Sequence, residues 1–257
     1  MYSFLKLALV TAVIATPAVP AFASDKPPIV LVHGAFADSS SWNGVIERLE
    51  KDGYSVTAIA NPLRGVKSDA EYVRSFVASL KTSVVLVGHS YGGSVISEAA
   101  KPSNVKALVY VAAFAPEVGE NAVGLSGKFP GGTLGDALQN PVSIPGGGSD
   151  LYIQQAKFHD QFAADVPAQA GELMAATQRP IAASALAETA TKAAWKDIPS
   201  WFIYGDADKN IPEAALSWMA ERAKSKKTVV VKGASHVVMV SNADKVAELV
   251  EEAAAAK

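Results

Sequence analysis

One short segment, residues 88–93 with the sequence GHSYGG, places the strongest constraint on how this chain can fold. The apolar run 84–87 before it predicts a buried strand, and the residues after it predict a helix to about Lys101. A serine on the sharp turn between such a strand and helix requires small residues two positions before and two positions after it, and both are glycine. The turn would present the Ser90 hydroxyl at the carboxyl end of the sheet, beside a helix N-terminus where negative charge is stabilised. The alternative is a serine in a glycine-rich packing turn.

The rest of the chain alternates between short apolar runs and segments with apolar residues at helical spacing. Runs that are rich in Val and Ile and lack polar alternation predict strands buried on both faces. These further runs are residues 29–32, 54–60, 107–111, 201–204 and 228–231. Strands that alternate with helices predict an α/β fold with a mainly parallel, doubly wound sheet.

Residues 116–195 interrupt this alternation, because they contain no strong strand pattern. They hold a glycine-rich loop and an Ala-rich stretch that favours helix. A structureless loop of this length is uncommon in a compact domain, so we expect a largely helical lid inserted between two strands of the sheet. A disordered insertion is the alternative, against which apolar residues such as Phe162 and Leu173 argue.

The N-terminal residues 1–23 have the pattern of a secretory signal peptide, with a short apolar run that ends in the small-x-small sequence 21–23. Cleavage after this sequence would leave residues 24–257 as one exported domain, periplasmic or secreted, without stable membrane insertion. A retained N-terminal anchor is the alternative, and Pro17 and Pro20 argue against a continuous spanning helix.

Composition excludes several other functions. The formal net charge is −2, from 23 basic and 25 acidic residues, and no basic run is present, so nucleic acid is not an expected partner. The chain has no cysteine, which excludes disulfides, a cysteine nucleophile and thiolate metal sites. We expect neither a metal nor an organic cofactor.

A serine hydroxyl needs a neighbouring base before it can act as a nucleophile. Of the four histidines, His33 and His89 stand beside glycines in turn motifs, where bracing the loops is the expected role, and His159 lies in the expected lid. His236 follows the last predicted strand directly, so it lies at a carboxyl strand end, as the serine does. We therefore expect His236 to be the general base.

The base must in turn be oriented by an acid. Asp206 and Asp208 both follow the strand predicted at 201–204, and both lie between the serine and His236 in the chain. We expect Asp208 to fill this role. Asp206 is the alternative, and its other expected role is to bond the backbone of its own turn.

Acyl transfer also requires hydrogen-bond donors for the developing oxyanion. The Tyr91 amide, at the start of the predicted helix, is one candidate. Gly34 would let the loop after the first strand turn back so that the Ala35 amide faces the site, and the Phe36 amide is the alternative donor. Large apolar side chains are candidate walls of the substrate pocket, with core packing as the alternative for each. They are Phe36, Tyr91, Phe114, Phe158, Trp195 and Met239.

Outside the lid, the chain resembles the α/β-hydrolase branch that contains plant methylesterases and hydroxynitrile lyases, together with many bacterial hydrolases. The motifs that carry this resemblance are 33–35 (HGA), 88–93, 112–116 (AAFAP), 208–212 (DKNIP) and 233–239. The resemblance implies catalytic roles for Ser90, Asp208 and His236, and oxyanion contacts from the Ala35 and Tyr91 amides. The lid and the export signal depart from the plant members.

These features together predict a serine hydrolase that cleaves small-molecule carboxylic esters through an acyl-enzyme, with thioesters, lactones and amides left open. Hydroxynitrile lyases of this branch typically have Thr where Gly34 stands and Lys directly after the histidine, where this chain has Val237. Hydrolysis is therefore expected over lyase chemistry. A ligand-binding protein with a vestigial site and a structural surface protein are the alternatives from other functional classes.

Overall fold

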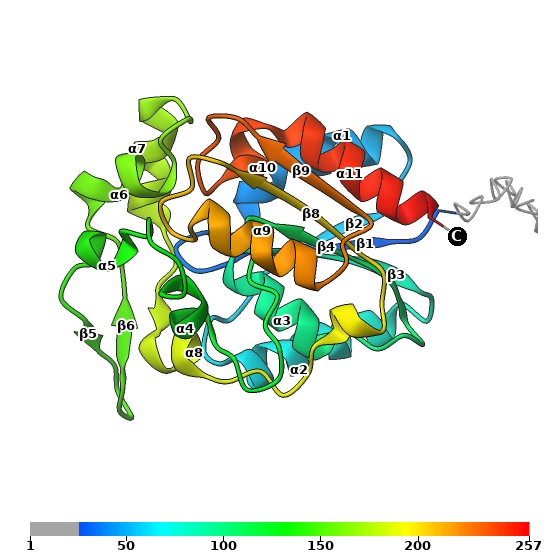
Figure 1. Ribbon diagram of the computed structural model, residues 1–257, viewed down its shortest axis with the longest axis horizontal. Coiled ribbons are helices and arrows are strands. Elements are labelled where there is room, and N and C mark those ends of the chain that lie inside the picture. The colour runs from blue at the N-terminus through cyan, green and yellow to red at the C-terminus, as the bar shows by residue number, and fades with distance from the viewer. Residues whose placement is uncertain (1–25, 257) are drawn as a thin grey trace, which may run out of the picture.

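Uninterrupted apolar runs form the centre of a six-stranded sheet, in which every neighbouring pair is parallel. The structure is a computed structural model that describes residues 26–256 (Figure 1). Strand order is β2-β1-β3-β4-β8-β9, which confirms the predicted α/β class with a parallel, doubly wound sheet. The strands are β1 (Ile29–Val32), β2 (Val56–Ile59), β3 (Val84–His89), β4 (Val105–Val111), β8 (Ser200–Gly205) and β9 (Lys227–Val231).

The two edge strands differ from the prediction that every strand is buried on both faces. All residues of the central strands β1, β3 and β8 are buried, whereas Val230 in β9 is 47% exposed and most of β2 is only partly buried. An edge strand has a neighbour on one side only. The exposure of β2 and β9 therefore follows from their position at the edges of the sheet, which the amino-acid composition of a strand does not reveal.

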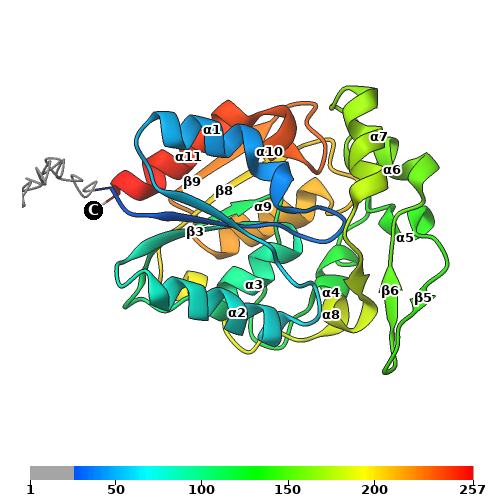
Figure 2. The ribbon, with the colours of Figure 1, turned by 180° about the vertical axis from the view of Figure 1, so that it is seen from behind.

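Helices cover both faces of the sheet. Figures 1 and 2 show α1 and α11 on one face, and α2, α3 and α9 on the other. Every residue of α3 is buried, so the helix that begins next to Ser90 cannot tilt without disturbing its packing. The helical segments are η1 (Ser39–Trp42), α1 (Asn43–Lys51), α2 (Val66–Ser79), α3 (Tyr91–Ala99), α9 (Glu213–Arg222), α10 (Val238–Ser241) and α11 (Ala243–Ala255).

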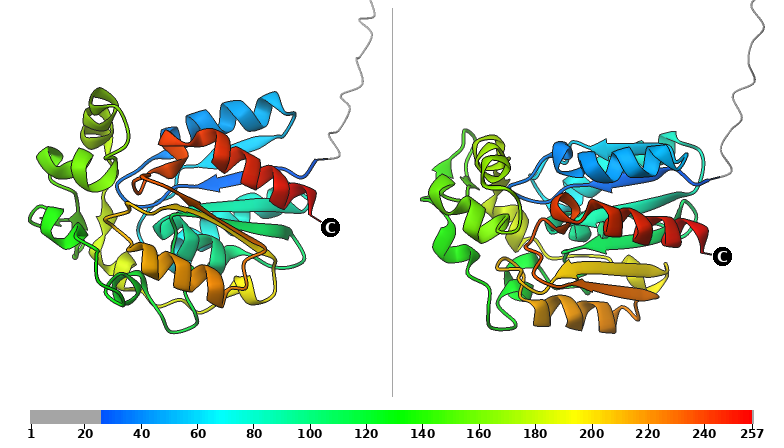
Figure 3. Two further views of the ribbon diagram at one scale, coloured as in Figure 1. Left: turned by 45° about the horizontal axis from the view of Figure 1, so that its top comes forward. Right: turned by 90° about the horizontal axis from the view of Figure 1, so that it is seen from above.

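The lid, residues 116–195, lies between β4 and β8 in the chain, and most of it stands beyond one end of the sheet (Figure 3). Its last residues run back along the face that α3 covers. It contains helices, as expected, and also a three-stranded antiparallel sheet of order β5-β6-β7 that was not expected. These strands are two or three residues long, too short for a sequence pattern to reveal them. The lid elements are α4 (Ala122–Ser126), α5 (Leu134–Ala137), β5 (Val142–Ser143), β6 (Ser149–Leu151), α6 (Gln155–Phe162), α7 (Ala168–Thr177), β7 (Ile181–Ala182), α8 (Ala183–Ala187) and η2 (Ala194–Lys196).

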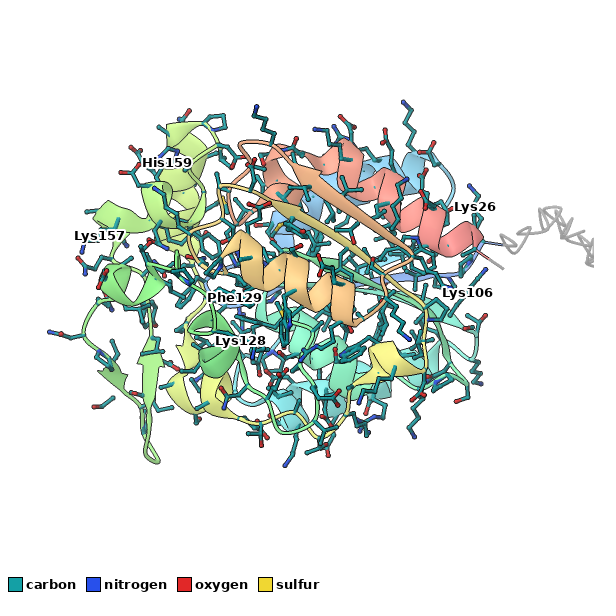
Figure 4. The ribbon with its side chains drawn as sticks, viewed as in Figure 1. Lys26, Lys106, Lys128, Phe129, Lys157 and His159 are labelled. Atoms are coloured by element: carbon teal, nitrogen blue, oxygen red, sulfur yellow. The ribbon has the colours of Figure 1, made fainter. Side chains whose placement is uncertain are left out.

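Polar and aromatic contacts fix the lid to the rest of the molecule. The buried Glu98 of α3 accepts a hydrogen bond from the Thr191 amide at 2.9 Å. Lys128 and Phe129, labelled in Figure 4, lie against Trp218 of α9: the Lys128 Nζ is 4.6 Å from its ring and the two aromatic centroids are 6.1 Å apart. The lid is therefore attached to both α3 and α9.

Within residues 26–256, no helix is both long and apolar enough to span a membrane. The predicted signal peptide, residues 1–23, lies outside the described residues. The first described residues and the end of α11 lie close together, at the end of the molecule opposite the lid (Figure 3).

Candidate active site

Ser90 stands on a strained turn between β3 and α3. Its backbone has φ 52° and ψ −123°, a conformation that costs a residue with a side chain about 1–3 kcal/mol. A Cβ on Gly88 would lie 2.6 Å from the Gly92 carbonyl oxygen, so the turn cannot close with larger residues at these positions. Hydrogen bonds of the Ser90 backbone to Val111 and Phe114 tie the turn to β4 and the loop after it. The two glycines and these hydrogen bonds thus hold the serine backbone in its strained conformation. Such strain persists only where the surrounding structure fixes the residue.

His236 and Asp208 form a buried pair at the carboxyl ends of β9 and β8. The His236 Nδ1 is 2.7 Å from the Asp208 Oδ2, and the side chains are 1% and 0% exposed. The other carboxylate oxygen, Oδ1, accepts hydrogen bonds from the Asn210 and Ile211 amides at 2.8 and 3.0 Å. These amides hold the carboxylate in place, and a ring that donates from Nδ1 keeps Nε2 free to act as a base.

Asp206, the alternative acid, occupies a different place. Its side chain is at the surface, and its Oδ1 accepts a hydrogen bond from the Gly233 amide. It therefore joins the two loops that carry Asp208 and His236, whereas the imidazole itself is paired with Asp208.

Ser90 and His236 line one cavity of about 360 Å³ beneath the lid. Two predicted wall residues, Phe36 and Phe114, line it as well. The remaining walls are mostly small or aliphatic, and several come from the lid. They are Ala35, Ala122, Val123, Ser126, Gly127, Gly132, Leu134, Gly135, Leu138, Leu151, Leu186, Asn210 and Ile211.

The other predicted wall residues do not line this cavity. Phe158 is fully buried against Phe162, with ring centroids 4.9 Å apart, and Met239 is fully buried in α10. Trp195 donates its indole N–H to the Pro116 carbonyl at 2.9 Å. The Tyr91 ring is likewise buried, and its hydroxyl lies 3.0 Å from the Asp69 carboxylate. In the structure these four side chains pack in the core, which was the alternative for each. A large apolar side chain gives the same sequence pattern in a core as in a pocket.

The leucines that do line the cavity were missed. They occur singly in short lid elements, so no periodicity marks them. Asn210 was also missed, although its place two residues after Asp208 could have drawn attention to it.

The loop after β1 lies directly on the serine turn. A Cβ on Gly34 would be 2.6 Å from the Ser90 Cβ and 3.2 Å from the Tyr91 nitrogen. Among residues 26–256, neither the Ala35 amide nor the Tyr91 amide has a hydrogen-bond acceptor. The alternative donor, the Phe36 amide, is already bonded to the Arg179 carbonyl at 3.0 Å. The arrangement thus leaves two backbone donors unpaired close to Ser90.

His33 and His89 are neutral structural groups. The Asn61 amide donates to the His33 Nε2 at 3.0 Å, so the His33 Nδ1 carries the proton and donates it to the Gly34 carbonyl at 2.9 Å. Burial lowers the pKa of His33 from 6.5 to about 4. Burial, together with the neighbouring His236, also holds the pKa of His89 well below its ordinary value, and the His89 Nε2 lies 3.1 Å from the His236 carbonyl oxygen. Each ring therefore braces a loop of the site.

Comparisons with known proteins agree with this fold. A model described as the alpha/beta hydrolase family matches residues 29–249. The alpha-hydroxynitrile lyase of Arabidopsis thaliana is 27% identical over 86% of this chain and 94% of its own length. Methylesterase 10 of the same plant is 26% identical over 88% of this chain and 91% of its own length. The crystal structure of polyneuridine aldehyde esterase superposes with a TM-score of 0.77 at 21% identity, covering 88% of this chain and 98% of that one, and so shares the fold.

Proposed function

Because the chain belongs to the alpha/beta hydrolase family, we propose that it is a serine esterase that cleaves small, uncharged carboxylic esters. The observation that carries the proposal is the buried Asp208–His236 pair, whose imidazole lines the same cavity as the strained Ser90. The match to a protein named as a methylesterase supports ester cleavage over other acyl transfers.

In the first step, His236 accepts the Ser90 proton as Oγ attacks the ester carbonyl carbon. Asp208 accepts the Nδ1–H hydrogen bond, which fixes the ring and stabilises the imidazolium that forms. Both side chains are almost inaccessible to solvent, so water weakens this interaction little. The Ala35 and Tyr91 amides would bind the oxyanion of the tetrahedral intermediate.

The same groups then complete the cycle. His236 donates its proton to the leaving alcohol as the carbon–oxygen bond breaks, which leaves the acyl group on Ser90. His236 next takes a proton from water, which attacks the acyl-enzyme, and returns that proton to Ser90 as the carboxylic acid leaves. Every proton in this cycle moves through one imidazole nitrogen.

The cavity walls support an uncharged, mostly apolar substrate. None of the described residues that line the cavity is Asp, Glu, Lys or Arg. A volume of about 360 Å³ is at the small end of ligand pockets, which typically measure about 300–1,000 Å³.

Cyanohydrin cleavage is the competing reaction, because one relative is named a hydroxynitrile lyase. Among the described residues, no lysine or arginine lines the cavity, so none could stabilise a cyanide leaving group there. The residue directly after His236 is Val237, which is fully buried. We therefore propose hydrolysis. Ser90-dependent release of cyanide from mandelonitrile, faster than any ester hydrolysis, would favour the lyase instead.

The proposal is tested with p-nitrophenyl esters from acetate to palmitate, incubated with wild type and with the Ser90→Ala variant. We expect Ser90→Ala to lower turnover by about 10⁴- to 10⁶-fold, as in other disabled triads. Ser94→Ala is the matched control, because this serine lies one turn further along α3 and its buried Oγ has no hydrogen-bond partner within residues 26–256. Equal turnover of all three proteins would refute the esterase, and tight stoichiometric binding without turnover would indicate a binding protein.

We also propose that residues 1–23 direct export and are then removed. The intact mass of protein recovered from the periplasm or the medium tests this. A mass that begins at Ser24 is expected, and a full-length mass in a membrane fraction would contradict it.

A further inference from the structure

The polar groups of the cavity outnumber those that the proposed reaction uses. Its polar side chains are Ser90, His236, Ser126 and Asn210. Ser90 and His236 carry out the chemistry, and Ser126 is partly exposed in α4. Asn210 is different, because it is only 4% exposed and therefore presents an amide inside a largely apolar space. A few well-placed polar groups in such a pocket usually fix the orientation of a ligand.

The orientation of the Asn210 amide is set by Gln161 of α6. The Gln161 Nε2 donates to the Asn210 Oδ1 at 2.8 Å and to the Lys209 carbonyl at 3.0 Å, while its Oε1 accepts from the Thr133 hydroxyl at 2.9 Å. Turning the Asn210 amide over would place two N–H groups against each other. The Asn210 oxygen therefore faces Gln161, which leaves the Nδ2 group as the free end of the side chain.

That Nδ2 group has no hydrogen-bond partner among residues 26–256, and it is not among their buried, unpaired polar atoms. Because the residue itself is buried and lines the cavity, the accessible donor faces the cavity. Its backbone is also fixed, since the Asn210 amide donates to the Asp208 Oδ1 at 2.8 Å. A rigid donor thus stands next to the proposed catalytic carboxylate.

We propose that Asn210 determines specificity by donating a hydrogen bond from Nδ2 to a second, uncharged oxygen of the substrate, such as an ether, ketone or further ester oxygen. This inference rests on the proposed esterase activity. The two oxygens of the reacting ester already have partners in that mechanism, because backbone amides bind the carbonyl oxygen and His236 protonates the leaving oxygen. An anionic acceptor does not fit, since no cation lines the described cavity.

The test uses pairs of esters of equal length in which one member has an oxygen in place of a CH₂ group. The pairs are methyl pentanoate with methyl ethoxyacetate, methyl pentanoate with methyl 3-methoxypropanoate, and butyl acetate with 2-methoxyethyl acetate. Acid release in a pH-stat gives kcat/KM, and each ratio is divided by the ratio of the hydroxide-catalysed rates to remove intrinsic reactivity. One neutral hydrogen bond predicts that wild type favours the oxygen-containing ester about 2- to 10-fold in at least one pair.

Asn210→Leu, which keeps the number and branching of the side-chain heavy atoms but removes the donor, should abolish that preference, read as the ratio of the two kcat/KM values measured for the variant itself. The control is Gln139→Leu, which likewise replaces a side-chain amide with leucine, at an exposed position of the lid, and should keep the preference. An ester-hydrolysing wild type with no preference in any pair overturns the Asn210 proposal and leaves the esterase standing. A preference that Asn210→Leu retains also overturns the Asn210 proposal and leaves the esterase standing. A wild type that hydrolyses none of these esters overturns the esterase and this proposal together, whether or not the variant folds.

Discussion

Protonation of His33 should destabilise the protein in mild acid. This ring is fully buried, and its Nε2 accepts the Asn61 amide hydrogen. A proton added to Nε2 would set two N–H groups against each other in the loop that carries Gly34 and Ala35. Because the pKa is lowered in the fold, the unfolded chain binds the proton first as the pH falls. The contribution of neutral His33 to the free energy of unfolding is therefore complete above pH 6.5 and is lost as the pH falls towards 4.

The size of the effect follows from the two pKa values. The pKa falls from 6.5 to about 4, and one unit corresponds to about 1.4 kcal/mol, so about 3 kcal/mol of unfolding free energy should be lost between pH 7.5 and pH 4. Urea unfolding followed by tryptophan fluorescence gives the free energy at each pH. The free energy of unfolding of wild type minus that of His33→Gln should fall by about this amount between pH 7.5 and pH 4. His89 is present in both proteins, so its contribution cancels in this difference.

Asn61→Ala is the matched control for this series. It removes the hydrogen bond from the Asn61 side chain to the His33 carbonyl but keeps both the imidazole and the backbone amide that bonds it. Its stability deficit should therefore be the same at every pH. A His33→Gln deficit that is also constant with pH would refute the reasoning.

Three further predictions concern single side chains of the site. Tyr91→Phe removes a hydrogen bond to the buried Asp69 carboxylate, so calorimetry should show a loss of about 2 kcal/mol and a Tm lower by roughly 4–8 °C; an unchanged Tm would contradict this. Asp208→Ala should lower the kcat of ester hydrolysis by about 10³- to 10⁴-fold and Asp206→Ala by only a few-fold, and the reverse order would exchange their roles. Gly34→Ala would force a Cβ to within 2.6 Å of the Cβ of the proposed nucleophile, so kcat/KM should fall by about 10²-fold or more with the fold retained, and an active variant would show that this loop yields easily.

The parts of the fold that could be predicted from the sequence are those with a long, local signal. The strands β1, β3, β4 and β8 each contain a continuous apolar run of at least four residues, and the serine turn is marked by its glycines. The exposure of β9 could not be predicted, because Val229 and Val230 have the composition of a central strand and only the strand order puts them at an edge. The small lid sheet gave no signal, since its strands are only two or three residues long, too short for an alternating pattern to be recognised.

The candidate site divides in the same way. The proximity of Ser90, Asp208 and His236 could be predicted because each follows a predicted strand, and parallel strands bring their carboxyl ends to one edge of the sheet. The cavity walls depend on contacts between segments far apart in the chain. The aromatic residues Phe158 and Trp195 were therefore assigned to the pocket although they pack elsewhere, and the isolated leucines of the lid were overlooked.

The most direct test of the proposed activity is covalent labelling of the native protein with a fluorophosphonate, read by intact mass and by fragmentation of the peptide that contains Ser90. Wild type should take up one label per chain, at Ser90. Ser90→Ala should take up none, and His236→Ala should react far more slowly because the hydroxyl has lost its base. A folded wild type that takes up no label, or a label that Ser90→Ala retains, would contradict the account.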